Sequence, residues 1–248
     1  MQIILFLLLI LNLISSIWLY TLEAHNTFFN YLYNFSYGLN FLLGLYYCFS
    51  RIPKYFKFRA LLIYFGLASL SFFVAQLIWL YYNLYATTAI PYPSIADYFW
   101  LAFYPLIGIG FMLLLKALKS TLNLSMLIEI IITAGVIFLV LSSFLSLNNT
   151  TLNLPILTVI LDYAYPIFDS IIISIAIAAL RSQAGRLHSQ ILYFVFGFIG
   201  LAVGDTLFTY QTALNTYWNG NIVDAIYAIS CFLIMMGFIS LPALVEEK

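Results

Sequence analysis

The run MQIILFLLLILNLISSIWLY, residues 1–20, decides the fold class of this chain. It is apolar over its whole length, and about 20 such residues in a helix cross roughly 30 Å of hydrocarbon. Apolar and polar residues do not alternate along it, as they would in the strands of a membrane barrel, so a helix is expected. The run has no basic start and no small-residue cleavage site, which favours a retained helix over a signal peptide.

The rest of the chain continues this pattern. Of its 248 residues, 65% are hydrophobic and 7% are charged, whereas a soluble domain carries about 25% charged residues. So few charges cannot cover a water-facing surface. The apolar runs predict helices near residues 2–20, 30–50, 59–83, 96–117, 123–146, 160–180, 189–211 and 222–243. We therefore predict an all-α, eight-helix integral membrane protein with a single membrane domain, residues 1–248.

The basic residues predict its orientation in a cell membrane. All nine lie at or beyond helix ends on one side of the predicted bundle: Arg51, Lys54, Lys57, Arg59, Lys116, Lys119, Arg181, Arg186 and Lys248. Because basic loops stay in the cytoplasm, both termini are expected there. Aromatic residues near the outer helix ends are expected in the headgroup layer: Trp79, Tyr81, Tyr82, Tyr92, Tyr98, Tyr217 and Trp218.

Two parts of the chain resemble one another. Laying Asp97 on Asp224 aligns DYFWLAFYPLIGIGF with DAIYAISCFLIMMGF and pairs Trp100 with Tyr227. A shift of two residues in the preceding loop aligns the helices before them and pairs Gln76 with Asp205. Leu-rich helices also align by chance, but the matched polar positions favour a repeat. A four-helix repeat would make residues 1–120 and 121–248 parallel halves, with room for a cavity between them.

Five aspartates lie in the outer half of predicted helices with no Lys or Arg beside them: Asp97, Asp162, Asp169, Asp205 and Asp224. A charge within the bilayer costs at least about 2.5 kcal/mol, so these side chains are expected to face the bundle interior or water. Asp97 and Asp224 start helices, where capping is the simpler explanation. Asp169 and Asp205 lie roughly 10–14 Å below the outer helix ends.

Helical spacing gathers these aspartates with aromatic residues. Asp162, Tyr165 and Asp169 share one face of their helix, and Asp97, Trp100 and Tyr104 share one face of theirs. We predict an outward-facing acidic and aromatic cavity that holds a small ligand, a cation or a proton. A polar network that only fixes helix packing is the alternative. The candidate residues are Gln76, Asp97, Trp100, Tyr104, Asp162, Tyr165, Asp169, Asp205 and Asp224.

Other signals in the sequence are structural or absent. Cys48 and Cys231 lie singly in apolar runs and are expected to pack there. Pro105 and Pro166 are expected to kink their helices, and Glu129 is expected to pair with Lys116 or Lys119. With two histidines and no catalytic or nucleic-acid-binding motif, we expect no metal, cofactor or nucleic acid. Carboxylates without a nucleophile also make an enzyme acting on lipid the least favoured function.

The stretch PSIADYFWLAFYPL, residues 93–106, resembles a P-S-x-A-D-x-x-(W/Y)-L-x-x-Y-P-L pattern. That pattern belongs to multi-helix membrane regions upstream of histidine kinase or diguanylate cyclase domains in archaeal and bacterial signalling proteins. Ala164-Tyr165-Pro166 with Asp169, and Gly204-Asp205 with Asp224, look like later landmarks, so the likeness covers residues 60–245. It implies a sensory module whose matched positions are Asp97, Trp100, Tyr104, Asp169, Asp205 and Asp224.

Three functions therefore stay open. The first is a non-enzymatic sensory or accessory module, which would act through a partner membrane or signalling protein because the sequence carries no kinase or cyclase domain. The second is a proton- or cation-coupled transporter or channel. The third is a structural subunit of a larger membrane complex. In each case the lipid bilayer is the expected surrounding.

Overall fold

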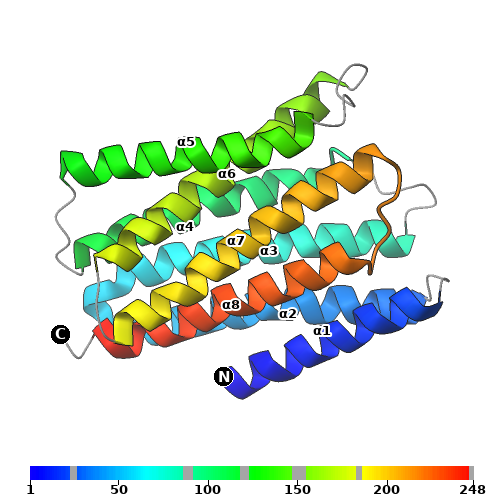
Figure 1. Ribbon diagram of the computed structural model, residues 1–248. Helices are drawn as coiled ribbons and strands as arrows, with labels where there is room; N and C mark the ends of the chain where they lie inside the picture. The colour runs from blue at the N-terminus through cyan, green and yellow to red at the C-terminus, as the bar shows by residue number, and fades with distance from the viewer. Residues whose placement is uncertain (23–26, 86–91, 118–122, 147–154, 183–185, 246–248) are drawn as a thin grey trace.

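The computed structural model describes residues 1–22, 27–85, 92–117, 123–146, 155–182 and 186–245. These residues form eight α-helices and one short 3-10 helix, and they include no strand. In chain order the elements are α1 (Gln2–Leu22), α2 (Thr27–Arg51), η1 (Phe56–Phe58), α3 (Arg59–Tyr85), α4 (Ile95–Ala117), α5 (Leu124–Ser146), α6 (Ile156–Arg181), α7 (Arg186–Ala213) and α8 (Ile222–Val245). Successive helices run up and down one elongated bundle (Figure 1).

The eight predicted helices are confirmed, with small differences at their ends. α6 begins at Ile156 rather than at residue 160, and α7 begins at Arg186 rather than at residue 189. Backbone hydrogen bonding continues a helix beyond its apolar run, and hydrophobicity alone does not mark that continuation. The earlier start of α6 places Asp169 about 20 Å along the helix from its first residue, deeper than predicted.

Seven of the helices, α1 and α3 to α8, are long and apolar enough to cross a membrane. α2 is not among them, although it has 25 residues. It carries three asparagines and five tyrosines, which lower its mean hydropathy. Several of these polar side chains, including Asn40, Tyr33 and Tyr37, are buried against other helices.

Six helices form the inner part of the bundle. α3 packs against α2 and α4, and α7 packs against α6 and α8. These two groups of three meet where α2 contacts α8 and where α4 contacts α6. α1 covers α2 and α8, whereas α5 lies at the edge of the bundle against α6 and α7 (Figure 1).

Phenylalanine rings fill the middle of the bundle. Phe41 of α2 stacks on Phe72 of α3 with ring centroids 4.0 Å apart, and Phe65 of α3 stacks on Phe238 of α8 at 4.6 Å. All four rings are buried. Large aromatic side chains contribute much of the contact area in such a core. The first pair therefore stabilises the packing of α2 on α3, and the second joins the two groups of inner helices.

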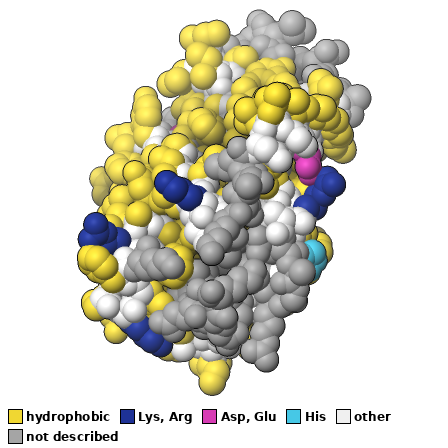
Figure 2. Space-filling model, turned by 90° about the vertical axis from the view of Figure 1, so that its left-hand side faces the viewer, with side chains coloured by type: hydrophobic (Ala, Val, Ile, Leu, Met, Phe, Trp, Pro, Cys, Tyr) yellow, Lys and Arg dark blue, Asp and Glu magenta, His cyan; other side chains and the backbone are white. Residues whose placement is uncertain are grey.

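Basic side chains gather at one end of the bundle. Arg51, Lys116 and Arg181 lie in the last turns of α2, α4 and α6, and Arg59 begins α3. Figure 2 shows this end, with Lys and Arg side chains spread among hydrophobic ones. Two other basic residues, Lys119 and Lys248, lie outside the described residues.

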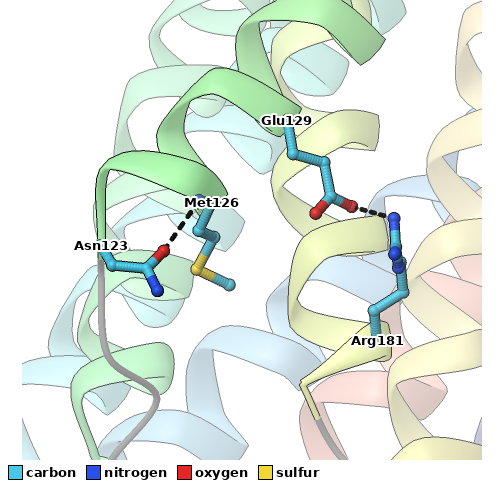
Figure 3. Close-up of polar contacts among 4 residues, drawn as sticks. All are labelled: Asn123, Met126, Glu129 and Arg181. Atoms are coloured by element: carbon cyan, nitrogen blue, oxygen red, sulfur yellow. Dashed lines mark hydrogen bonds and ion pairs between the residues drawn. The ribbon is translucent and has the colours of Figure 1, made fainter.

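Glu129 pairs with Arg181, a partner that was not predicted from the sequence. Its Oε1 accepts a hydrogen bond from Nη1 of Arg181 at 2.5 Å (Figure 3), so the prediction of Lys116 was wrong, while Lys119 lies outside the described residues. α5 packs along α6, and this packing brings Glu129 to the end of α6. The nearby Asn123 side chain accepts a hydrogen bond from the Met126 N–H and caps α5 (Figure 3).

The cysteines and prolines lie within helices. Cys48 and Cys231 are free and buried, as expected of packing residues. Pro105 and Pro166 lie inside α4 and α6, each of which continues as one helix through its proline.

Candidate functional site

A cavity of about 60 Å³ lies among the inner helices. A water molecule needs about 10–15 Å³ of such space, so the cavity holds a few waters or a small ligand. Its helical lining residues lie in the middle and second half of α3, in the second half of α7, and in the first half of α2, α4, α6 and α8, so the cavity lies in the half of the bundle opposite the basic residues. It is lined by Tyr33, Tyr37, Phe72, Gln76, Trp79, Asp97, Trp100, Tyr104, Tyr165, Leu201, Asp205, Phe208, Thr209, Tyr217, Asp224 and Tyr227.

Seven of the nine predicted site residues line this cavity. They are Gln76, Asp97, Trp100, Tyr104, Tyr165, Asp205 and Asp224. The other two, Asp162 and Asp169, are buried on α6 outside the lining. The structure thus brings side chains from α3, α4, α6, α7 and α8 to one place, and none of the described lining residues is Lys, Arg or His.

Asp97 caps α4 and also faces the cavity. Its Oδ2 accepts hydrogen bonds from the Ser94 N–H at 2.6 Å and from the Ser94 hydroxyl at 3.1 Å. Its Oδ1 accepts a hydrogen bond from the Tyr165 hydroxyl of α6 at 2.7 Å. One carboxylate oxygen therefore stabilises the start of the helix, while the other joins α4 to α6.

Asp224 repeats this arrangement at the start of α8. Its Oδ2 accepts a hydrogen bond from the Gly220 N–H, and its Oδ1 accepts one from the Tyr217 hydroxyl at 3.0 Å. Burial and the neighbouring Asp224 carboxylate raise the pKa of Tyr217 well above its ordinary value, so this phenol stays a donor. Tyr33 of α2 donates to the Asp224 backbone carbonyl at 3.2 Å.

Gly220 has the backbone conformation that this cap requires. Its φ is +103°, which residues with a Cβ rarely adopt. A Cβ placed there would also lie 2.6 Å from Leu19 Cδ1 of α1. Glycine at this position therefore lets the turn direct its N–H at Asp224 while α1 packs over it.

Asp205 lies about two turns before the end of α7, so no helix start is available to stabilise its charge. Its Oδ1 accepts a hydrogen bond from the Tyr227 hydroxyl at 2.6 Å, and its Oδ2 lies 2.9 Å from the Tyr104 hydroxyl. The same hydroxyl of Tyr104 lies 2.7 Å from Oδ1 of Asp169. Tyr104 thus connects a cavity carboxylate with one behind the cavity wall.

Asp162 has a separate partner. Tyr92, just before α4, donates a hydrogen bond to Asp162 Oδ1 at 2.7 Å. Burial, followed by the nearby Asp162 charge, raises the pKa of Tyr92 above its ordinary range, which keeps the phenol protonated. Asp162 therefore joins α6 to the segment before α4 without facing the cavity.

Gln76 lines the cavity. Its side chain is 5% exposed, and it makes no hydrogen bond to any described residue. A buried amide that lacks a partner loses hydration free energy, so a ligand or water in the cavity would satisfy it.

Several residues of the cavity lining are not among those predicted from the sequence. Tyr33 and Tyr37 are four residues apart on α2, a helical spacing that was a usable signal. Trp79 and Tyr217 were predicted in the headgroup layer but line the cavity, and Trp79 donates to Asn219 Oδ1 at 3.4 Å. By contrast, Tyr81 is highly exposed, as that layer requires.

The described residues contain no group of three or more His, Cys, Asp or Glu side chains placed to hold a metal ion. Comparison with protein-family models, with curated proteins and with solved structures finds no match for this chain.

Proposed function

We propose that this chain is a multi-pass membrane protein that binds a small organic cation in its acidic and aromatic cavity and works as a sensory or accessory module through a partner protein. The observation that carries the proposal is the cavity lining. It combines three aspartates with ten aromatic side chains and contains no described basic residue. Carboxylates and aromatic faces together attract ammonium groups, because the ring quadrupole adds to the ionic attraction.

The bilayer is the surrounding that suits the helices. Seven of them are long and apolar enough to cross it, and α5 exposes Ile131, Leu139 and Phe144 at the edge of the bundle. The basic end of the bundle would then lie in the cytoplasm, and the cavity end would lie outside. A cation from outside would reach the cavity without passing the basic residues.

Asp205 is the principal counter-ion in this proposal. The carboxylates of Asp97 and Asp224 accept backbone N–H groups at helix starts, where the helix dipole offsets part of their charge. Asp205 accepts hydrogen bonds only from side chains among the described residues, and it is half-buried in the wall. Its charge is therefore the most available to a bound cation.

The ligand has to be small. The space holds a few water molecules at most, which suits an ammonium group with a short substituent rather than a larger metabolite. The amide of Gln76 is available as an acceptor for an N–H of such a ligand. Trp100 and Tyr227 are half-buried and line the same cavity as Asp205, and the Tyr227 hydroxyl contacts this carboxylate.

A binding experiment tests this proposal. Methylammonium chloride and the neutral analogue methanol would be titrated against the purified protein in lipid nanodiscs, with sodium chloride controlling for ionic strength. We expect methylammonium alone to bind. Asp205→Asn should weaken its binding about ten- to a hundredfold, because a hydrogen bond to a charged group contributes about 1.5–3 kcal/mol.

Asp162→Asn is the matched control, because Asp162 has the same side chain and one tyrosine partner but does not line the cavity. It should leave methylammonium affinity unchanged. Equal loss of binding in both variants, or no binding to the unchanged protein, would overturn the proposal.

The sensory role is supported by the resemblance of residues 93–106 to membrane regions of signalling proteins. Purification in mild detergent tests for the proposed partner. A stoichiometric co-purifying membrane or signalling protein would support the role. A chain that purifies alone at native expression levels would contradict it.

Transport is the second candidate, and the pairing of cavity residues favours it. The predicted repeat pairs Gln76 with Asp205, Asp97 with Asp224 and Trp100 with Tyr227, and all six side chains line the cavity. A site between two repeated halves is typical of transporters that alternate access. Methylammonium flux into proteoliposomes that is lost in Asp205→Asn would favour transport over sensing.

A further inference from the structure

Asp169 is a buried acid that the proposed cation site does not use. It is 1% exposed, and it lies behind Tyr104 rather than in the cavity lining. It lies about 20 Å along α6, near the middle of this 26-residue helix, and so near the middle of a bilayer that α6 would cross. Its Oδ2 is buried and has no hydrogen-bond partner among the described residues.

The Tyr104 hydroxyl contacts two carboxyl groups but has only one proton to donate. The Tyr104 hydroxyl lies within hydrogen-bond distance of Asp169 Oδ1, at 2.7 Å, and of Asp205 Oδ2, at 2.9 Å. A phenol has one proton to donate. If both carboxyl groups were ionised, one of these two contacts would place lone pairs against a negative charge. The three groups therefore need a second proton.

The hydrogen bonds indicate which group carries that proton. Asp205 already accepts a hydrogen bond from Tyr227 and borders the cavity, so its negative charge is stabilised. Asp169 has one oxygen without a donor and is almost fully buried, so its ionised form would be costly. The proton is thus best placed on Asp169.

We propose that Asp169 is a proton-binding site, in which the carboxylic O–H of Asp169 donates to Tyr104 and Tyr104 donates to ionised Asp205. This chain of hydrogen bonds links the proton on Asp169 to the cavity. The link to ligand binding rests on the proposed function, whereas the protonation of Asp169 does not.

The other titratable groups near Asp169 are already accounted for. Tyr104 faces it from α4 and Asp205 from α7, and Tyr227 of α8 lies one hydrogen bond further. On α6 itself, Tyr165 donates to Asp97. From α5, Glu129 pairs with Arg181 at the far end of α6. None of these contacts supplies a basic partner to Asp169.

Proton binding at Asp169 and cation binding beside Asp205 should oppose each other. A proton on Asp169 and a cation beside Asp205 are two positive charges drawn to the same pair of carboxyl groups. Binding of either one therefore disfavours the other. As the pH rises and Asp169 loses its proton to solvent, cation affinity should increase.

Infrared spectroscopy tests the proton directly. At neutral pH the unchanged protein should show the carbonyl band of a buried carboxylic acid. Asp169→Asn should abolish this band, because the amide mimics the protonated acid in shape and hydrogen bonding. Asp162→Asn should leave it unchanged. Absence of the band in the unchanged protein, or its persistence in Asp169→Asn, would overturn the proposal.

A second variant covers the case in which Asp169→Asn does not fold. Tyr104→Phe removes the acceptor of the proposed O–H bond, so it should shift the band to the frequency of a less strongly bonded acid. An unshifted band would contradict the assignment to Asp169.

The pH dependence of methylammonium affinity tests the coupling between Asp169 and the cavity. Methylammonium affinity should rise with pH more steeply in the unchanged protein than in Asp169→Asn, and equal slopes would contradict the linkage. If methylammonium does not bind at all, the proposed function fails, while the infrared result still decides whether Asp169 holds a proton.

Discussion

At the scale of residues, Asp97 and Asp224 show how one carboxylate serves two structural tasks. In each, Oδ2 accepts a backbone N–H before the helix and Oδ1 accepts a tyrosine hydroxyl. Capping and cavity formation were alternatives for these residues in the sequence, but the structure combines them. A carboxylate has two oxygens with several acceptor sites, so neither task excludes the other.

Gly220→Ala tests the cap at Asp224. The substitution forces a Cβ into a positive-φ conformation and against Leu19. We expect the free energy of unfolding to fall by about 1–3 kcal/mol. Thermal unfolding in detergent measures this effect. Gly108→Ala is the control, because a Cβ there would come no closer than 4.0 Å to Ile172. A Gly220→Ala variant as stable as this control would contradict the account of the cap.

At the scale of elements, α7 and α8 approach each other closely because small residues line their contact. A Cβ on Gly197 would lie 2.7 Å from Ile234 Cγ1 and 3.0 Å from the Ser230 backbone oxygen. The backbone of α8 cannot move away from such a contact without disturbing the whole pair. This closeness also holds Asp205 of α7 within reach of Tyr227 of α8.

Gly197→Ala should therefore lower the free energy of unfolding by about 1–3 kcal/mol through overpacking. Gly135→Ala on α5 is the matched control, since nothing lies within 4 Å of a Cβ there. That control should be neutral or stabilising by up to about 1 kcal/mol, because alanine has the higher helix propensity. Thermal unfolding of both variants in one detergent measures the difference. Equal effects would show that α7 and α8 are less tightly packed than the structure indicates.

At the scale of the whole molecule, the two ends of the bundle differ in charge. Arg51, Lys116 and Arg181 lie at one end, whereas Asp97 and Asp224 lie near the other. In a membrane this difference predicts that the basic end is cytoplasmic.

Labelling of single cysteines in intact cells tests that orientation. Cys48 and Cys231 are buried, so the unchanged protein should react little with a membrane-impermeant maleimide. Thr216→Cys, on the exposed segment between α7 and α8, should be labelled in intact cells. Lys116→Cys should be labelled only after the membrane is opened. The reverse pattern would contradict the orientation.

Much of the architecture could be predicted from the sequence. Hydrophobicity located all eight helices, and seven of them are apolar enough to cross a membrane whatever they pack against. Helical spacing placed Asp97 and Trp100 together, since residues on one helix share a face through local geometry alone. Local pattern could not predict that Glu129 pairs with Arg181. Nor could it predict that Trp79 and Tyr217 face the cavity.

The sequence by itself determined the helical class, the spans and the presence of uncompensated acids within them, because these properties depend on local composition. The tertiary structure alone decided that Asp205 faces a cavity while Asp169 lies behind it, and that one hydroxyl of Tyr104 joins them. Contacts between α4, α6 and α7 depend on the rotation and depth of each helix. Those quantities result from packing over the whole bundle, which no single segment encodes.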